Sequence, residues 1–262
     1  MPQIRILVSG AAGKMGQAVI AAVAAEPDML LVGGLDEQAA IKSIPLPGGR
    51  SMPLFTDTVE ALDKTKPNVV IDFSTAKAVL PLARAVFGRG IHMVSGTTGL
   101  TQDDLGEIDK LAKAGRAGAF VASNFAIGAI VMMHLAKTAA RYFDYAEIIE
   151  EHHQTKIDAP SGTALTTAQM MAAERGKPFI TPAHLGEQPS RGLEKTGISI
   201  HSVRIPGIVA RQEVIFGAAG QTLSIRHEAI SRECYMPGVI LAAREVAKHT
   251  GLVFGLDKLL SL

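Results

Sequence analysis

The 262-residue chain lacks the features that mark several classes of protein. It has one cysteine, Cys234, no tryptophan and only 5% aromatic residues. A single cysteine excludes an intrachain disulfide, as is typical of a reducing compartment. The 26 basic and 25 acidic residues give a formal charge of +1 without any basic block, which disfavours a nucleic-acid-binding surface. No apolar run is long enough to span a membrane, so we expect a soluble cytoplasmic protein.

Apolar residues, by contrast, are abundant: 47% of the chain is hydrophobic and 19% is charged. The chain can therefore bury a large core, and its length allows one large domain or two smaller ones. Through residues 4–122, short apolar runs rich in β-branched residues alternate with helix-forming segments, which predicts a doubly wound parallel sheet. We expect strands at 4–8, 30–35, 69–73, 91–95 and 119–122, and helices at 17–25, 76–88 and 101–114.

Residues 41–66 interrupt this alternation. They contain Pro45, Pro47 and Pro53 together with the pair Gly48-Gly49. Because proline and glycine punctuate regular structure, we expect an irregular segment here and assign it no role.

The first predicted strand runs into a glycine-rich turn, Gly10-Ala11-Ala12-Gly13-Lys14-Met15-Gly16, and then into a helix. Strand, glycine turn and helix form the context in which a backbone closely approaches a pyrophosphate, which then lies on the helix N-terminus. The spacing is GxxGxxG rather than GxGxxG. A P-loop is excluded because Met15 follows Gly13-Lys14 and the preceding glycine is only three positions back. The turn therefore predicts a dinucleotide cofactor.

The second predicted strand ends at Asp36, where an acidic side chain is placed to accept hydrogen bonds from an adenosine ribose. Glu37 beside it would repel a 2′-phosphate and favours NADH. Lys14 in the glycine turn would offset that repulsion. The residues therefore leave both NADH and NADPH open, with NADH favoured.

Three further predicted strands end in small or polar residues: Phe73-Ser74, Gly96-Thr97-Thr98-Gly99 and Ser123-Asn124-Phe125. Ligands of doubly wound sheets bind outside the carboxyl ends of the strands. Each segment alone is an ordinary turn, but together they predict one rim of a cofactor site.

The pattern changes after residue 126. A long helix of small and apolar residues, buried on most of its faces, is expected at 127–143, and later strands at 210–216 and 222–227 are expected to form a hairpin. The predicted fold class is α/β: a Rossmann-like doubly wound parallel sheet with a second α+β domain that carries a mostly open mixed sheet. Residues 1–126 form the dinucleotide-binding domain, to which residues 235–262 return, and residues 127–234 form the second domain.

The second domain holds the stretch around which the rest is organised, Glu150–Ala164, between a predicted strand and a predicted helix. His152, His153 and Lys156 are three cationic or cation-capable residues within five positions, and free helix amides follow Ser161-Gly162-Thr163. Both features suit a small molecule with more than one carboxylate. The alternative is a solvated loop in which Ser161 is an ordinary N-cap. A metal site is not expected, because adjacent histidines on an extended segment point to opposite faces.

These motifs, in this order over nearly the whole chain, resemble the 4-hydroxy-tetrahydrodipicolinate reductase (dihydrodipicolinate reductase) family of lysine and diaminopimelate biosynthesis. The segment from Glu151-His152-His153 through Lys156 to Asp158-Ala159-Pro160-Ser161-Gly162-Thr163-Ala164 is highly specific to it. The resemblance implies hydride transfer from a nicotinamide cofactor to a cyclic, unsaturated dicarboxylate after loss of water. It also implies a homotetramer assembled through the second domain, which would serve in substrate binding and oligomerisation.

The resemblance also implies a role for individual residues. His152 would donate the proton, Lys156 would be a second donor, and His153, Gly162 and Thr163 would bind substrate carboxylates. Arg232 is a weaker candidate for closing the site. An arginine often follows the ribose-binding acid in this family, whereas Glu37 stands here, which places NADPH use in doubt. The cofactor-binding residues would be Gly10, Ala11, Ala12, Gly13, Lys14, Met15, Asp36, Gly96, Thr97, Thr98, Ala122, Ser123, Asn124 and Phe125.

Three other functions share part of this pattern. Short-chain dehydrogenases and epimerases need a Tyr-x-x-x-Lys pair, which is absent because Ala146, Ile149 and Val239 lie four positions after the three tyrosines. A reductase acting on another imine or keto acid stays open. A non-catalytic NAD sensor would need the cofactor half of the chain but not His152, His153 and Lys156.

Overall fold

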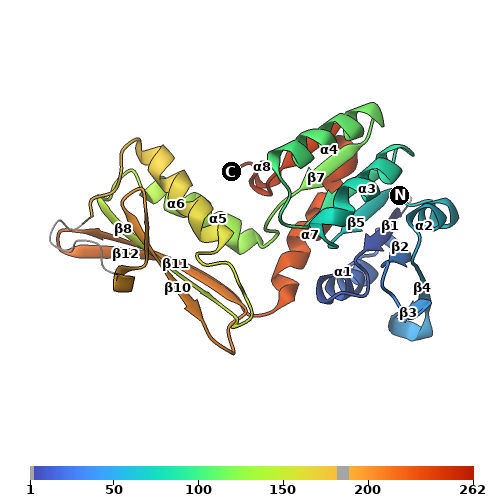
Figure 1. The fold of residues 1–262 in the computed structure, drawn as a ribbon, viewed down its shortest axis with the longest axis horizontal. Helices are drawn as coiled ribbons and strands as arrows, with labels where there is room; N and C mark the ends of the chain where they lie inside the picture. The colour runs from blue at the N-terminus through green and yellow to red at the C-terminus, as the bar shows by residue number, and fades with distance from the viewer. Residues whose placement is uncertain (1–2, 182–188) are drawn as a thin grey trace. The chain divides into compact units, whose positions relative to one another are not determined.

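A computed structural model describes residues 3–181 and 189–262 (Figure 1). The chain forms two compact units, Met1–Phe125 with Tyr235–Leu262, and Ala126–Cys234. The first unit is thus built from two segments of chain that the second unit separates. No helix of the described residues is both long and apolar enough to cross a membrane.

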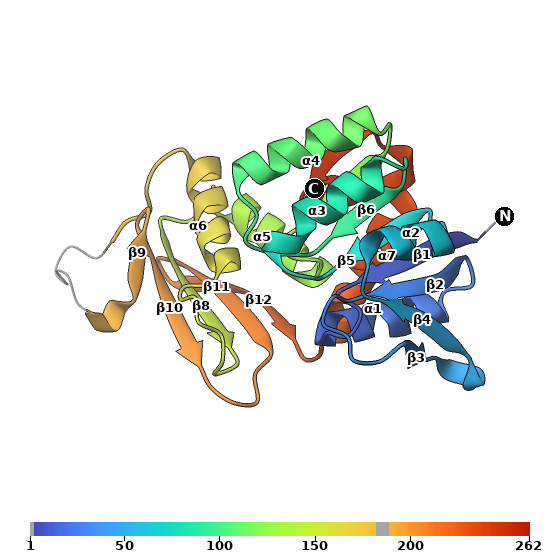
Figure 2. The same ribbon diagram turned by 45° about the vertical axis from the view of Figure 1, so that its right-hand side comes forward.

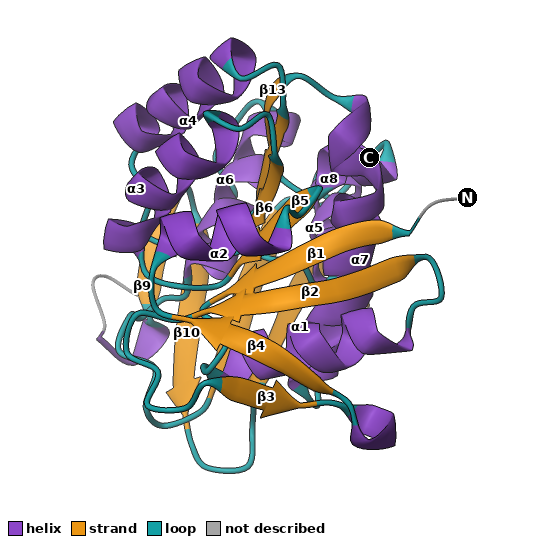
Figure 3. Ribbon diagram, turned by 90° about the vertical axis from the view of Figure 1, so that its right-hand side faces the viewer, coloured by secondary structure: helices purple, strands orange, loops and turns teal. Residues whose placement is uncertain are grey.

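The first unit contains an eight-stranded sheet in the order β13-β7-β6-β5-β1-β2-β4-β3 (Figure 3). Neighbouring strands are parallel except β3, which is antiparallel to β4. This confirms the predicted doubly wound parallel sheet. The strands are β1 (Ile4–Ser9), β2 (Met29–Leu35), β3 (Ser43–Pro45), β4 (Ser51–Phe55), β5 (Val69–Asp72), β6 (His92–Ser95), β7 (Gly118–Val121) and β13 (Gly251–Phe254).

Helices cover both faces of this sheet (Figure 3). α2 (Thr58–Thr65), α3 (Ala76–Phe87) and α4 (Gln102–Ala114) pack side by side on one face, and α1 (Lys14–Ala25) and α7 (Met236–Glu245) pack together on the other. Since both faces are covered, the central strands are apolar without alternation. Leu7, Val70 and Met93 of the strands are fully buried in one core with side chains of α2, α3 and α4. Short segments complete the unit: η1 (Pro47–Gly49), η3 (Arg232–Tyr235, which begins in the second unit), η4 (Val246–Lys248) and α8 (Asp257–Leu260).

The prediction that residues 41–66 are irregular is wrong. They form the β3–β4 hairpin and α2. Pro45 is tolerated because β3 is the edge of the sheet, where a missing N–H costs no ladder hydrogen bond on the open side. Pro53 lies in β4, one residue before Leu54, where the pairing of β4 with β2 begins. α2 is capped by Asp57, whose side chain accepts from the backbone N–H of Glu60 at 2.7 Å.

The last strand of the sheet, β13, was not predicted. It is a four-residue strand that pairs in parallel with β7, and its Leu252 N–H donates to the Asp109 carboxylate at 2.9 Å. So short a run carries no period of its own. Its structure is set by pairing with a strand more than a hundred residues earlier.

The second unit contains a five-stranded mixed sheet in the order β12-β11-β8-β10-β9. Only β8 and β10 are parallel neighbours, and β11 and β12 form the predicted hairpin. α5 (Ile127–Ala139) and α6 (Gly162–Arg175) lie side by side on one face of the sheet, as Figures 1 and 2 show. The strands are β8 (Tyr145–His152), β9 (Leu193–Lys195), β10 (Ile198–Arg204), β11 (Ala210–Ala218) and β12 (Gln221–Ala229), and η2 (Pro189–Arg191) precedes β9.

The helix predicted at 127–143 is shorter and less buried than expected. It ends at Ala139, and Val131 and Leu135 are 37% and 48% exposed. A helix that covers one face of a sheet buries a single stripe, which here includes Met132 and Ala136. Apolar residues outside this stripe, such as Val131 and Leu135, therefore remain exposed although the sequence suggested burial on most faces.

Candidate active site

The residues predicted to bind a cofactor follow four parallel strands of the first unit, β1, β2, β6 and β7. In the order β7-β6-β5-β1-β2, the carboxyl ends of these strands lie along one edge of the sheet. The chain leaves β1 toward β2 on one side and later returns to β5 on the other, so β1 and β5 flank the point where strand order reverses. Such a switch point is where doubly wound folds bind their ligands.

The glycine turn after β1 is shaped for close approach of another group. Gly10 has a φ of +73°, and a Cβ there would lie 2.4 Å from the Phe73 carbonyl oxygen. A Cβ at Gly16 would lie 2.1 Å from the Gly10 carbonyl oxygen. α1 begins after Gly13, so the amides of Lys14 and Met15 precede the first acceptor within the helix. A helix start of this kind fits a pyrophosphate.

Asp36 lies beside this turn at the end of β2. Its Oδ2 accepts from the Ala12 N–H at 3.0 Å, and its Oδ1 accepts from the Gln38 N–H at 3.2 Å. A carboxylate has about four acceptor positions, so both oxygens keep capacity for the hydroxyls of a ribose. Glu37 and Lys14 are both exposed.

Asp72, at the end of β5, is a residue of this rim that sequence reasoning missed. It is fully buried. Its Oδ1 accepts from the Ser74 hydroxyl at 2.6 Å, and its Oδ2 accepts from the hydroxyls of Ser95 and Thr97, each at 2.8 Å. One carboxylate therefore holds the turns after β5 and β6 together. The only sequence signal was an acidic residue ending an otherwise apolar strand.

The remaining predicted cofactor residues differ in exposure. Thr97, Ala122 and Phe125 are buried, whereas Thr98 and Ser123 are exposed. The Phe125 ring packs against the Phe73 ring with centroids 5.9 Å apart, and a Cβ at Gly96 would lie 2.1 Å from that same Phe73 ring. These buried residues thus shape the edge.

In the second unit, His152 is the last residue of β8 and its Nδ1 lies 2.6 Å from Glu150 Oε2. Glu150 is fully buried. Its carboxylate also accepts two hydrogen bonds from the Arg204 guanidinium, at 2.8 and 2.9 Å, and one from the Ser161 N–H at 3.2 Å. Sequence reasoning missed both Glu150 and Arg204.

The pKa of Glu150 reflects this environment. Burial would raise it, but hydrogen bonds from His152, Arg204 and Ser202 outweigh burial and lower the pKa from 4.5 to about 2. The carboxyl is therefore ionised at neutral pH and can accept a hydrogen bond from the Nδ1–H of His152.

The other cation-capable residues of this stretch have partners of their own. Lys156 Nζ lies 2.7 Å from both carboxylate oxygens of Asp158, and His153 Nδ1 lies 2.8 Å from the Thr155 hydroxyl. The Lys156 ammonium holds the pKa of Asp158 below its usual range. A substrate carboxylate would therefore compete with Asp158 for Lys156. Among residues 3–181 and 189–262, no group of three or more metal-ligating side chains is clustered.

The start of α6 has the features both of an ordinary N-cap and of an anion-binding helix start. Ser161 is the N-cap, and its hydroxyl accepts from the Ala164 N–H at 3.2 Å. That bond leaves the amides of Gly162 and Thr163 in the first turn, where they have no acceptor within the helix. Gly162 is exposed and Thr163 is half-buried. The cap therefore does not prevent an anion from binding at this helix start. Arg232, the weaker candidate, is exposed in η3.

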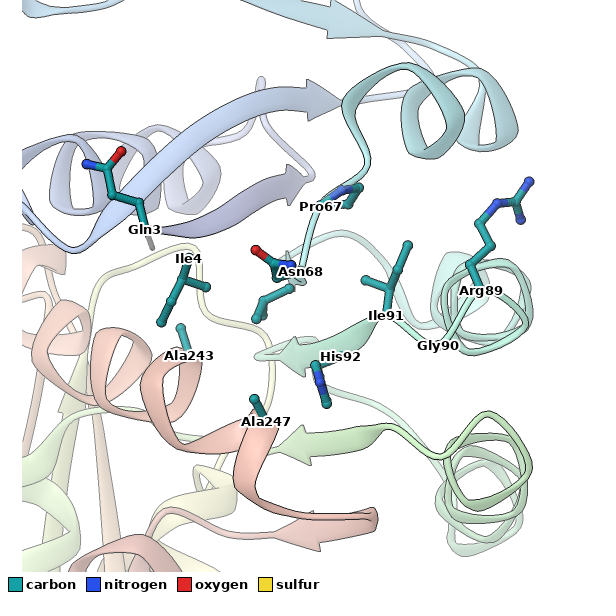
Figure 4. Close-up of a pocket in the computed structure, with 11 residues that line it drawn as sticks. Gln3, Ile4, Pro67, Asn68, Arg89, Gly90, Ile91, His92, Ala243 and Ala247 are labelled. Atoms are coloured by element: carbon teal, nitrogen blue, oxygen red, sulfur yellow. The ribbon is translucent and has the colours of Figure 1, made fainter. Parts of the chain in front are cut away.

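A cavity of about 550 Å³ lies elsewhere in the first unit, at the opposite ends of the strands (Figure 4). Its walls include Ile4, Asn68 and His92, near the starts of β1, β5 and β6. In Figure 4 the guanidinium of Arg89 extends away from the other labelled side chains. Because the cavity is at the amino ends of the strands, it is distinct from the edge where a dinucleotide would bind.

The fold and the glycine turn together define an NAD(P)H-dependent oxidoreductase with a Rossmann-like domain. Two family models match nearly all of the chain: "Dihydrodipicolinate reductase, N-terminus" over residues 4–125 and "Dihydrodipicolinate reductase, C-terminus" over residues 128–260. The chain belongs to the dihydrodipicolinate reductase family.

Individual relatives agree with this assignment. The chain is 50% identical to a 4-hydroxy-tetrahydrodipicolinate reductase of Dehalococcoides mccartyi over 100% of both chains. It is 44% identical to one of Moorella thermoacetica over 98% of both chains. A solved structure, a dipicolinate-bound dihydrodipicolinate reductase of Paenisporosarcina sp. TG-14, has a TM-score of 0.84 and 37% identity, covering 98% of this chain and 99% of its own.

Proposed function

We propose that this protein reduces 4-hydroxy-tetrahydrodipicolinate to tetrahydrodipicolinate, with loss of water, in diaminopimelate and lysine biosynthesis. The observation that carries the proposal is the His152–Glu150 pair, 2.6 Å apart, in a member of the dihydrodipicolinate reductase family. A histidine whose Nδ1 is engaged presents Nε2 as the group that can move a proton. The reduced nicotinamide, when bound, would supply hydride to the substrate.

The residues of the second unit would bind and protonate the substrate. His152 would donate the proton, and Lys156 would act as a second donor that stabilises the developing negative charge. His153 and the first-turn amides of Gly162 and Thr163 would bind carboxylates. A cyclic dicarboxylate suits this set, and the Paenisporosarcina relative was solved with dipicolinate bound.

The first unit would bind the cofactor through Gly10, Ala11, Ala12, Gly13, Lys14 and Met15, with Asp36 on the ribose and Gly96, Thr97, Thr98, Ala122, Ser123, Asn124 and Phe125 along the rim. We propose NADH as the preferred cofactor. Asp36 and Glu37 place two carboxyl groups in sequence at the end of β2, where a 2′-phosphate would meet like charge. Lys14 is the residue that would permit some use of NADPH.

We further propose a homotetramer assembled through the sheet of the second unit. α5 and α6 cover one face of that sheet. Strand alternation puts Ile149, Val203 and Ile215 on the other face, and all three are half-buried there. These apolar residues stand among ion pairs of the same face, such as Glu151–Arg211. A mixed face of this kind, without helices, favours a second copy as its cover. Light scattering on the purified protein would give the mass directly.

The test of the reaction couples this protein to dihydrodipicolinate synthase. Aspartate semialdehyde and pyruvate would supply the unstable substrate, while oxidation of NADH and of NADPH is followed in parallel. We expect oxidation that depends on the synthase and is faster with NADH. Folded protein that binds NADH but oxidises neither cofactor would contradict the proposal and favour an NAD sensor or a reductase of another imine.

A further inference from the structure

Glu150 is a buried carboxylate that contacts His152 and is not itself among the groups proposed to bind or protonate the substrate. Its side chain is on the face of β8 that α5 and α6 cover, and none of it is exposed. Donors from four residues converge on its two oxygens. They are His152 Nδ1, both terminal nitrogens of Arg204, the Ser161 N–H and the Ser202 side chain. An ionised carboxylate is expensive to bury without such compensation.

The contact with His152 determines which nitrogen of that ring is available. A carboxylate only accepts, so at 2.6 Å it requires the proton to reside on Nδ1. Nε2 is then the nitrogen that gives up a proton and remains bare afterwards. A partner on one ring nitrogen sets the tautomer in this way in many sites.

The contact with Ser161 links the same carboxylate to the start of α6. Ser161 is 11 residues after Glu150 and caps the helix whose first amides are Gly162 and Thr163. Arg204 strengthens this link, because its Nη2 also donates to the Asp158 carbonyl oxygen at 2.7 Å. Glu150 and Arg204 therefore connect β8, β10 and the loop between β8 and α6.

We propose that Glu150 is a positioning residue: it holds His152 in the Nδ1–H tautomer and fixes the ring relative to the start of α6. Its effect on turnover rests on the proposed function, whereas its effect on the tautomer does not. The guanidinium of Arg204 compensates the charge of Glu150. Among the described residues, Glu150 is the only titratable group in contact with His152 Nδ1.

The first test is the tautomer of His152 itself, read from ¹⁵N chemical shifts of histidine-labelled protein at a pH where the ring is neutral. His152→Gln identifies the signal. We expect the proton on Nδ1 in the native protein. In Glu150→Gln, Arg204 and Ser161 retain the single amide oxygen, the amide NH₂ faces the ring, and the proton moves to Nε2. A native ring with its proton on Nε2 would overturn the proposal.

The second test is turnover. In serine proteases, a carboxylate-to-amide change that imposes the wrong tautomer lowers kcat about 10⁴-fold. For Glu150→Gln we expect a loss of about 10²-fold or more in kcat, with the KM for NADH unchanged. Glu151→Gln is the matched control, because Glu151 is the adjacent residue, points to the other face of β8 and pairs with Arg211 instead. Equal turnover of the two variants would refute the positioning role.

If Glu150→Gln did not fold, the double variant Glu150→Gln/Arg204→Gln would replace it in both tests. The double variant removes both charges and lets the two amides pair. The double variant should again move the His152 proton to Nε2; a ring that keeps it on Nδ1 would refute the proposal. Absence of turnover in the native protein would count against the proposed reaction alone, since the tautomer measurement needs no substrate.

Discussion

The backbone N–H of Ala12 donates to Asp36 Oδ2 across 3.0 Å, so the glycine turn after β1 is tied to the acid that ends β2. The two features that predicted a dinucleotide from sequence are thereby parts of one structure. A change next to Asp36 should alter cofactor choice without dismantling the turn.

Replacing Glu37 with arginine should raise the preference for NADPH over NADH. The change removes a like charge and adds a donor, and a hydrogen bond between charged groups contributes about 1.5–3 kcal/mol, or at least about tenfold. The measurement is the ratio of kcat/KM for the two cofactors. Glu37→Gln should show part of the shift, because it removes repulsion only. An unchanged ratio in Glu37→Arg would mean that the 2′-phosphate is bound elsewhere.

His152→Ala should lose mainly turnover. General-acid catalysis contributes about 10²–10⁴-fold, so kcat should fall by that factor while the Kd for NADH stays the same. Steady-state kinetics with the dicarboxylate would measure it. His134→Ala, on α5 of the same unit, is the control and should keep full activity. Near-native turnover of His152→Ala would show that another group donates the proton.

Thr163→Ala should mainly raise the KM for the dicarboxylate. Alanine keeps the Thr163 amide, so the change removes only the hydroxyl beside it, which we expect to donate to the same carboxylate. Loss of one hydrogen bond costs about 0.5–1.5 kcal/mol, which corresponds to about 2- to 12-fold. Thr166→Ala, an exposed position on the same helix, should leave KM unchanged. A fall in kcat at constant KM would argue that Thr163 acts in the chemical step instead.

Asp72→Asn should weaken both the fold and cofactor binding. The amide cannot accept from Ser74, Ser95 and Thr97 as the carboxylate does, and an unsatisfied buried group costs about 1–3 kcal/mol. Urea unfolding and fluorescence titration with NADH would measure the two effects. Asp63→Asn, which breaks an exposed ion pair with Arg89, should cost less than about 1 kcal/mol. Equal losses in the two variants would contradict the role given to Asp72.

Asp158→Asn should lower the KM for the dicarboxylate. Because the pKa of Asp158 is lowered by Lys156, the pair is intact at neutral pH and a substrate must displace it. Exposed pairs contribute about 0.2–1 kcal/mol, so the gain should not exceed about fivefold. Glu60→Gln, which loosens an exposed pair with Lys64 in the first unit, is the control. A higher KM in Asp158→Asn would show that Asp158 orients Lys156 rather than occupying it.

The alternation of apolar runs and helix formers was enough to predict the doubly wound sheet, because each buried strand carries its own local signal. β3 and β13 have no such signal. They are short edge strands whose pairing is determined by distant partners. The same limit applies at the site. His152 and Lys156 stand out in a compact polar stretch, whereas Arg204 is 54 residues from the carboxylate it pairs with, and no spacing rule connects them.

The return of Tyr235–Leu262 to the first unit has a consequence for biosynthesis. A ribosome delivers the chain amino end first, and β13 and α7 emerge only after all of Ala126–Cys234. At about 5–20 residues per second, the nascent first unit waits for about 5–20 s with the β7 edge unpaired and one sheet face covered by α1 without α7. Open edges of this kind invite aggregation. Synthesis of the second unit is therefore complete before that of the first unit, although the first unit begins the chain.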